Sequence, residues 1–369
     1  MRPRRILRSR PLMRWRQALR CIVRTPALLL IAGLPPGLAG ALPPAQAAPC
    51  AEAPRAAEAH RDRLSAALRD GFGVQYWGAA YDAEGLSAAP HGLLIVEATR
   101  VGADRSADGR EQLFTPAEIA RISHEGRRPV IAYLNLAEIE SYRHYHARTP
   151  REEQRWQGPT SASGERLAAY WRPEWHEVLR ERVDELMRLG FDGLFLDDVL
   201  HYYTHAAGET QPTPGYDASD APGDAPAHAR AMMALVVDLA EHARRQRCDA
   251  IVVVNNGAFI GRDAGPDPAT AESPGPFARY RSAISAILAE SVFDTNNRQP
   301  TIDALREDFL DRGVQVMSID FKTHFVGPGG ESYRELVRRR AAKAGFAAYV
   351  ADDEAFNRLY EPIRAPAIR

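Results

Sequence analysis

The chain of 369 residues repeats one pattern, a short apolar run followed by a helical stretch or a long polar connection. The apolar runs have the length and composition of buried strands. We expect eight strands, at Val74–Trp77, Leu93–Glu97, Val130–Leu136, Gly193–Asp198, Ile251–Asn255, Ala286–Ser291, Val314–Asp320 and Phe346–Ala351. The intervening helices are expected at Pro116–Glu125, Pro173–Leu189, Pro226–Gln246, Thr301–Arg312 and Tyr333–Ala344. Eight such units predict an α/β chain that folds as a single (β/α)8 TIM barrel.

The connections indicate where a functional site would lie. Helix-to-strand connections are short, whereas the strand-to-helix loops 137–172, 199–225, 256–283 and 321–332 are long. Such loops gather on the C-terminal face of a barrel, where barrel enzymes hold their active sites. Aromatic side chains on these loops either stack on the flat faces of a sugar or pack the loops down. They are Tyr142, Tyr145, Trp156, Tyr170, Trp171, Trp175, Tyr202, Tyr203, Tyr216, Phe277, Tyr280 and Phe325.

Carboxylates end several of the expected strands. In the run Gly-Phe-Asp-Gly-Leu-Phe-Leu-Asp-Asp at 190–198, a strand stops in Asp197 and Asp198, and Glu290 ends a later strand. A buried ionised carboxylate is costly unless it is paired, so these strand ends suggest a function. A glycosidase needs two carboxylates at such a mouth. The competing interpretation is that the acids cap loops and pair with the many arginines.

Alternation along the strands places further polar groups at the same mouth. Phe195 and Asp197 share one face of their strand, and Tyr133 and Asn135 share one face of another. The sequence has weaker signals for a metal site, a nucleotide cofactor or a serine nucleophile. His201 and His205, with Asp198, could bind a metal if they lie on one helical face. These histidines lie in a loop rich in Gly, Pro and Asp, which does not favour a helix, so we expect no metal. The chain has no P-loop, dinucleotide-binding glycine pattern or Gly-x-Ser-x-Gly motif after a strand, so we expect no cofactor.

The N-terminus predicts export. Residues 1–48 carry nine arginines and no acids, followed by an apolar run and the small residues Ala45-Gln46-Ala47, as in a signal peptide. Residues 49–70 would form a leader helix or tether, and residues 71–365 the catalytic domain. The net charge of −1 would become about −10 after cleavage, which argues against a nucleic-acid partner. Export would permit a Cys50–Cys248 disulfide, and the sequence leaves this pairing open.

Five segments together resemble the endo-α-1,4-polygalactosaminidase family, glycoside hydrolase family 114. They are Tyr133–Arg143, Tyr170–Trp175, Gly190–Asp197, Ala289–Phe293 and Val316–Phe321. The resemblance covers about residues 71–361 and implies a (β/α)8 barrel that cleaves α-1,4-linked galactosamine and N-acetylgalactosamine polymers. By position, it implies that Asp197 and Glu290 are the catalytic pair. The implied positions near the sugar are Tyr133, Glu138, Arg143 and Asp320.

The sequence departs from the family pattern at Ala137, where glycine is usual, and Asp198 occupies a variable position. Asn135, Asp198 and Tyr202 complete the predicted substrate contacts. We expect Glu290 to be the general acid and Asp197 the nucleophile or base.

The resulting prediction is a secreted or periplasmic, monomeric, endo-acting glycosidase that binds an amino-sugar polymer and has no stable membrane insertion after signal cleavage. The alternatives are a non-catalytic polysaccharide-binding barrel and a metal-dependent deacetylase that uses Asp198, His201 and His205.

Overall fold

The computed structural model describes residues 56–102, 105–107, 109–148, 154–211, 213, 216–267, 274–293, 298–324 and 332–365. All of them belong to the unit Pro49–Arg369. The predicted signal peptide and Cys50 lie outside the described residues. Cys248 takes part in a disulfide.

Eight parallel strands form one sheet in the order β1-β2-β5-β8-β10-β11-β12-β13. The last strand returns to the first, and the backbone N–H of Tyr76 donates to the carbonyl of Phe356 at 2.8 Å across this seam. The predicted (β/α)8 TIM barrel is therefore confirmed, and each strand begins and ends within two residues of its predicted limits. The strands are β1 (Phe72–Gln75), β2 (Leu93–Val96), β5 (Val130–Asn135), β8 (Gly193–Asp197), β10 (Ile251–Asn255), β11 (Ala286–Glu290), β12 (Gln315–Phe321) and β13 (Ala347–Ala351).

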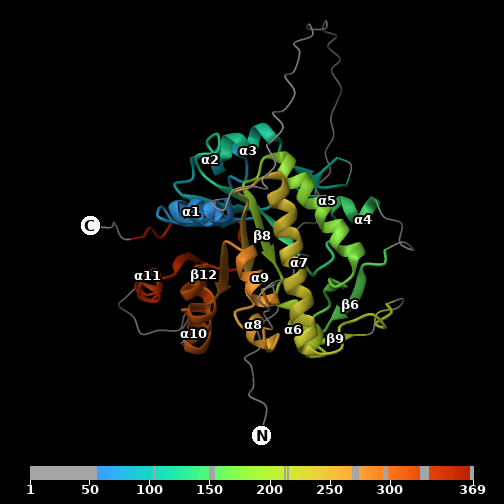
Figure 1. Cartoon of the computed structure of the whole chain (residues 1–369). Coiled ribbons are helices and arrows are strands. Elements are labelled where there is room, and N and C mark those ends of the chain that lie inside the picture. The colour runs from blue at the N-terminus through green and yellow to red at the C-terminus, as the bar shows by residue number, and fades with distance from the viewer. Residues whose placement is uncertain are drawn as a thin grey trace, which may run out of the picture. The chain divides into compact units, whose positions relative to one another are not determined.

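Helices surround the sheet, and α5 and α7 lie side by side against it (Figure 1). Local signals set their ends. Thr115 caps α3 and forms a capping box with Glu118, and α5 ends at Gly190, whose φ of 95° suits glycine. The helices that connect successive barrel strands are α2 (Ala83–Ala88), α3 (Pro116–Ile122), α5 (Pro173–Leu189), α7 (Ala225–Gln246), α9 (Pro276–Ala283), α10 (Gln299–Asp308) and α11 (Tyr333–Ala344). Short helices in the connections are α4 (His144–Arg148), α6 (His201–Ala206), α8 (Ile260–Asp263), η3 (Leu310–Arg312) and η4 (Lys322–His324).

The apolar core has two layers, one inside the barrel and one between the strands and the helices. Along β8, Phe195 belongs to the inner layer, whereas Leu194 and Leu196 belong to the outer layer. Since side chains alternate along a strand, Asp197 points the same way as Phe195. The predicted shared face of Phe195 and Asp197 is thus confirmed.

Helix α1 (Ala56–Leu68) covers the N-terminal end of the barrel. Leu64 and Leu68 join the inner apolar layer. His60 Nδ1 lies 2.7 Å from Ser285 Oγ, just before β11. Arg63 forms an ion pair at 2.6 Å with Asp192, just before β8. The helix therefore closes the end of the barrel opposite the strand ends that carry the predicted site.

Two small antiparallel sheets, absent from the sequence prediction, order the connections. Strand β3 (Thr99–Val101) pairs with β4 (Gln112–Leu113). Strand β6 (Gln157–Ser161) pairs with β7 (Arg166–Ala168) and with β9 (Thr210–Gln211). Because β6 follows β5 and β9 follows β8, this sheet ties the predicted loops 137–172 and 199–225 together.

The predicted loop aromatics mostly pack the loops down. The largest fully buried side chains include Trp156, Trp175, Tyr170, Tyr202 and Tyr280. Trp175 also donates from Nε1 to the Leu136 carbonyl at 2.7 Å, directly after β5. Tyr142 and Tyr203 remain exposed. Among the described parts of the chain, no helix combines the length and apolar character needed to cross a bilayer.

Candidate active site

Three polar side chains end three neighbouring strands of the barrel. Asp197 ends β8, Asn255 ends β10 and Glu290 ends β11. The strands are in register here, since Leu196 pairs with Val254 and Asn255 with Leu288. Parallel strands present their carboxyl ends at one edge, so the three side chains meet at the C-terminal mouth.

Asn255 joins the two predicted catalytic carboxylates. Its Nδ2 donates to Asp197 Oδ1 at 2.8 Å and to Glu290 Oε1 at 2.9 Å. Because the two N–H bonds of an amide diverge by roughly 120°, the accepting oxygens lie about 5 Å apart, close to the carboxylate separation of retaining glycosidases. Asn255 is only 3% exposed, so solvent does not compete for these bonds.

The residue after each of these strand ends has a left-handed backbone. Asp198, Asn256 and Ser291 have φ values of 61°, 63° and 53°. Non-glycine residues rarely adopt this conformation, and they do so mainly where the surrounding structure holds them. The bonds that hold these turns include Ser291 N to the Ile319 carbonyl at 2.7 Å and Glu290 N to Asn256 Oδ1 at 3.1 Å.

The two carboxyls have different electrostatic environments. Burial, with a further contribution from Asp197, raises the pKa of Glu290 to about 7. Burial also raises the pKa of Asp197, but hydrogen bonds from Asn255, the Asp198 N–H and Tyr133 oppose this shift. Asp197 therefore has several donors that stabilise its charge, whereas Glu290 is placed to hold a proton near neutral pH.

Two tyrosines and an asparagine line the mouth beside Asp197. Tyr133 donates to Asp197 and packs against Tyr76 with ring centroids 4.8 Å apart. Asn135 donates from Nδ2 to Tyr133 Oη at 3.3 Å and to Asp198 Oδ2 at 2.5 Å. Its Oδ1 accepts from the N–H groups of Ala137 and Glu138 at 3.0 and 2.8 Å. The structure therefore places predicted residues Tyr133, Asn135, Glu138 and Asp198 together at the mouth, around the Ala137 position where glycine is usual.

His201 joins Asp198 and Glu138, whereas His205 does not. His201 Nε2 lies 3.2 Å from Glu138 Oε1 and 3.7 Å from Asp198 Oδ1. His205 packs on Trp171 and His228, and burial lowers its pKa to about 3. The alternative metal set of Asp198, His201 and His205 is therefore not assembled.

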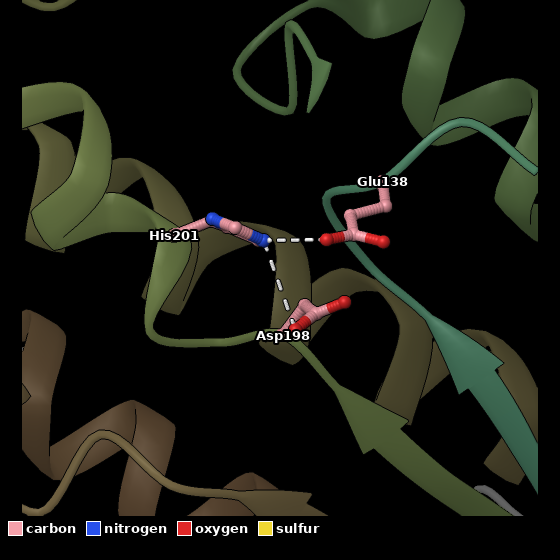
Figure 2. A group of neighbouring side chains, drawn as sticks. All are labelled: Glu138, Asp198 and His201. Carbon is pink, nitrogen blue, oxygen red and sulfur yellow. Dashed lines mark hydrogen bonds and ion pairs between the residues drawn. The ribbon is translucent and has the colours of Figure 1, made fainter. Parts of the chain in front are cut away.

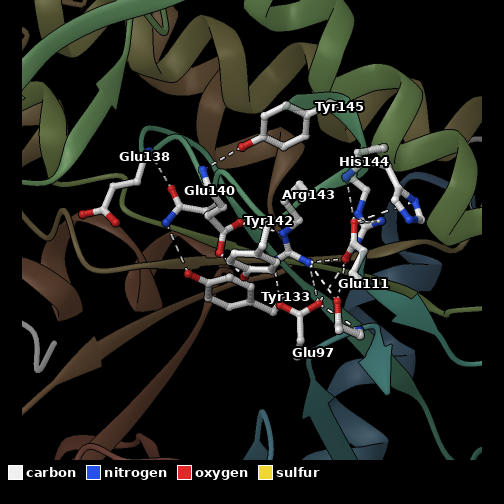
Figure 3. Close-up of polar contacts among 12 residues, drawn as sticks. Glu97, Glu111, Tyr133, Glu138, Glu140, Tyr142, Arg143, His144 and Tyr145 are labelled. Atoms are coloured by element: carbon white, nitrogen blue, oxygen red, sulfur yellow. Dashed lines mark hydrogen bonds and ion pairs between the residues drawn. The ribbon is translucent and has the colours of Figure 1, made fainter. Parts of the chain in front are cut away.

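Arg143 lies in an ion-pair network rather than at the mouth (Figure 3). Its guanidinium contacts Glu97 at 2.6 Å, Glu140 at 2.9 Å and Glu111 at 3.1 Å, and its side chain is 4% exposed. Burial raises the pKa of Glu111, but Arg143 and Arg182 outweigh it and lower that pKa to about 2. The donors of Arg143 are used by buried carboxylates in the structure, and its contact with the substrate stays a prediction.

Asp320 and Tyr202 also have partners within the protein, and their contacts with the substrate stay predictions. Ile319 and Phe321 face the barrel interior, so Asp320 points outward between them. Asp320 is fully buried, and its Oδ1 accepts from Phe293 N at 2.7 Å. Tyr202 is 2% exposed and donates to Asp263 Oδ2 at 2.5 Å. Both side chains anchor loops.

Asn255 and Tyr76 lie at the site but are not among the residues predicted from the sequence. Asn255 ends its strand as Asp197 and Glu290 do, so the same strand-end signal could have identified it. Burial, and then the nearby charges of Asp197 and Glu290, raise the pKa of Tyr76 well above the usual value. Tyr76 therefore lies close to both carboxyls. It follows β1 directly, and no local motif marks it.

Residues 103–362 match a family model described as Glycoside-hydrolase family GH114. Uncharacterized proteins of Deinococcus radiodurans and Thermotoga maritima are 25% and 28% identical to the chain. The first match covers 84% of this chain and 88% of the relative, and the second covers 67% and 72%.

Among solved structures, Aspergillus fumigatus Ega3 in complex with galactosamine has a TM-score of 0.54 at 13% identity, over 80% of this chain and 96% of that one. The glycoside hydrolase domain of PelA from Pseudomonas aeruginosa has a TM-score of 0.50 at 18% identity, over 79% and 97%. At these identities, the two structures support the shared fold.

Proposed function

Because the chain belongs to glycoside-hydrolase family GH114, we propose that it hydrolyses α-1,4-linked galactosamine and N-acetylgalactosamine polymers as an endo-acting enzyme. The chain is a glycosidase by family membership. The polymer is proposed from the family resemblance of the sequence, and the similar fold of Ega3, whose structure contains galactosamine, supports it.

We assign catalysis to Asp197 and Glu290. The observation that carries this assignment is the single amide of Asn255 that donates to both carboxylates. With a pKa of about 7, Glu290 keeps a proton to donate to the leaving glycosidic oxygen. Asp197 accepts several hydrogen bonds that favour its charged form and is suited to attack the sugar.

The proposed mechanism retains the anomeric configuration. In the first step, Asp197 forms a bond to the anomeric carbon while Glu290 transfers its proton to the departing oxygen. In the second step, Glu290, now ionised, removes a proton from water, which displaces Asp197 and releases the sugar. A carboxylate separation of about 5 Å supports this route, because inversion needs roughly 6.5–9.5 Å to accommodate a water molecule.

We also propose that the enzyme acts as a monomer outside the cytoplasm, in the medium or the periplasm. The support is the arginine-rich N-terminal segment with its following apolar run and small residues. In this proposal, residues 1–48 are removed, and residues 71–365 form the catalytic domain behind the 49–70 leader.

Defined galactosamine and N-acetylgalactosamine oligomers would test the proposal, with products read by mass spectrometry and the first-formed anomer by NMR. We expect internal cleavage with retained configuration, reduced at least about 100-fold in Asp197→Asn and Glu290→Gln. Deacetylated but uncut chains would favour the deacetylase, and bound but unchanged chains would favour a binding protein. Wild-type rates in either variant would overturn the assignment of the pair.

A further inference from the structure

Glu138, Asp198 and His201 form a second polar cluster beside the catalytic pair (Figure 2). They come from the loop after β5, the position directly after β8 and the start of α6, and one side-chain donor atom from each lies within 4.8 Å of the others. Figure 2 shows the imidazole and the two carboxylates converging on one point. The His201 Nε2 distances of 3.2 and 3.7 Å bring a nitrogen and two oxygens together.

Residues outside the cluster hold its donor atoms in place. His201 Nδ1 lies 3.1 Å from Thr204 Oγ1, and a proton donated there leaves a lone pair on Nε2, which faces the carboxylates. Asn135 occupies Asp198 Oδ2 at 2.5 Å and leaves Asp198 Oδ1 directed at His201. The same asparagine accepts from the Glu138 N–H at 2.8 Å. Such outer partners are typical of metal ligands, since they fix the imidazole tautomer and the carboxylate orientation.

Among the described residues, no permanent cation forms an ion pair that balances the charge of this cluster. Within the described residues, no arginine or lysine forms an ion pair with Asp197, Asp198 or Glu138, and His201 is the one basic group in contact with the last two. The nearby acids Glu97, Glu111 and Glu140 instead share Arg143. The buried acids around Arg143 thus have a built-in cation, whereas the acids of the cluster have a histidine that can act as a ligand.

We propose that Glu138, Asp198 and His201 bind a divalent first-row transition-metal ion such as Zn²⁺. Ligands about 2.1 Å from a tetrahedral zinc ion lie roughly 3.4 Å from one another, and the two distances from His201 Nε2 fall on either side of this value. One imidazole and two carboxylates favour Zn²⁺ or Mn²⁺ over Mg²⁺ and Ca²⁺, which prefer oxygen ligands alone. The site revises the sequence-based expectation of no metal, and it does not depend on the proposed polymer.

Calorimetric titration of the chelator-treated full chain with Zn²⁺ tests the site, with bound metal measured by elemental analysis. We expect one equivalent per chain, and weaker binding of Mg²⁺ and Ca²⁺. His201→Gln should weaken Zn²⁺ binding at least about 10-fold. His205→Gln is the matched control, because it removes a histidine from the same helix that packs on aromatic rings instead, and it should leave the affinity unchanged.

Glu138→Gln provides a second test should His201→Gln fail to fold, with circular dichroism as the check on each variant. It should also weaken Zn²⁺ binding at least about 10-fold. Absence of saturable one-to-one binding, or equal affinity in these variants and the wild type, would overturn the proposal. Binding of galactosamine to metal-free protein that His201→Gln abolishes, with no Zn²⁺ bound under any condition, would also overturn it and assign the cluster to the sugar ammonium.

Discussion

At the scale of single residues, Asn255 lowers the pKa of both catalytic carboxyls. Its amide stabilises the charged form of both, so it lowers the pKa of Asp197 and of Glu290 against the effect of burial. The pKa of Glu290 is nevertheless about 7, because burial and then the charge of Asp197 raise it by more than the amide lowers it. The active form therefore has ionised Asp197 and protonated Glu290.

This balance predicts a bell-shaped pH dependence of kcat/KM. Activity should fall above about pH 7, as Glu290 loses its proton, and should fall on the acid side as Asp197 gains one. Asn255→Ala removes a donor to both carboxylates, so both limbs should move up by roughly one pH unit and the maximal rate should drop. Initial rates measured from about pH 4 to about pH 10 would check both limbs.

The matched comparison is Asn135→Ala, which removes donors to Asp198 and Tyr133 and leaves the amide of Asn255 in place. The alkaline limb, which Glu290 governs, should stay where it is in that variant. An Asn255→Ala profile that coincides with the wild-type profile would contradict the proposed role of the amide.

At the scale of elements, the loop after β5 depends on one buried arginine. Arg143 lies in this loop and connects it to Glu97 after β2 and Glu111 beside β4 (Figure 3). The same loop carries Glu138, whose side chain reaches the mouth. The arginine thus positions a loop that supplies the site without contacting the site itself.

Arg143→Met should destabilise the protein by about 3–5 kcal/mol, because it leaves buried carboxylates without their cation. Arg338→Ala is the control, since its ion pair with Glu335 is exposed on α11, and it should change the free energy of unfolding little. Urea denaturation at pH 7 measures both. Equal stability of the two variants would mean that the network contributes nothing beyond a surface pair.

Most elements could be predicted because their signals are local. Apolar runs fixed the strands, Thr115 and Pro116 marked the start of α3, and Gly190 marked the end of α5. The sheet of β6, β7 and β9 could not be predicted, since its strands are two to five residues long and pair across separate loops.

The same distinction between local and long-range signals applies to the predicted site residues. Asp197 followed from alternation with Phe195. Alternation also places Asp320 on the opposite face of its strand from Phe321, which faces the barrel interior. For Arg143, no sequence pattern distinguishes a donor to a sugar from a donor to buried acids, because that choice depends on which loops meet.

At the scale of the whole molecule, the raised pKa of Glu290 has a cost in stability. The native state holds this proton up to about pH 7, whereas the unfolded chain releases it near the usual value of 4.5. Stability is therefore lost as the pH rises between these values, by up to about 3 kcal/mol. Sites tuned for catalysis often carry such a cost.

Glu290→Gln should therefore be more stable than the wild type at pH 8, and the difference should vanish near pH 4.5. Denaturant midpoints of the two proteins at both pH values would measure it. A constant difference between the two proteins at all pH values would contradict the raised pKa and indicate a packing effect instead.

The net charge predicts a difference between substrates. The mature chain would carry about −10, so a cationic galactosamine oligomer should be attracted to it and a neutral N-acetylated oligomer should not. Raising the salt concentration should increase KM for the cationic oligomer and leave KM for the neutral one unchanged. Equal salt effects on both would show that charge plays no part in substrate binding.

The left-handed residues after β8, β10 and β11 also limit how the mouth can be redesigned. At positions 198, 256 and 291, glycine, asparagine and aspartate fit the backbone, whereas β-branched residues would cost about 1–3 kcal/mol. A saturation library over the rim should therefore recover a narrow set of amino acids at these three positions and a broad set at exposed Tyr203. New specificities are more readily selected from the surrounding loops, while the turns that aim Asp197, Asn255 and Glu290 stay as they are.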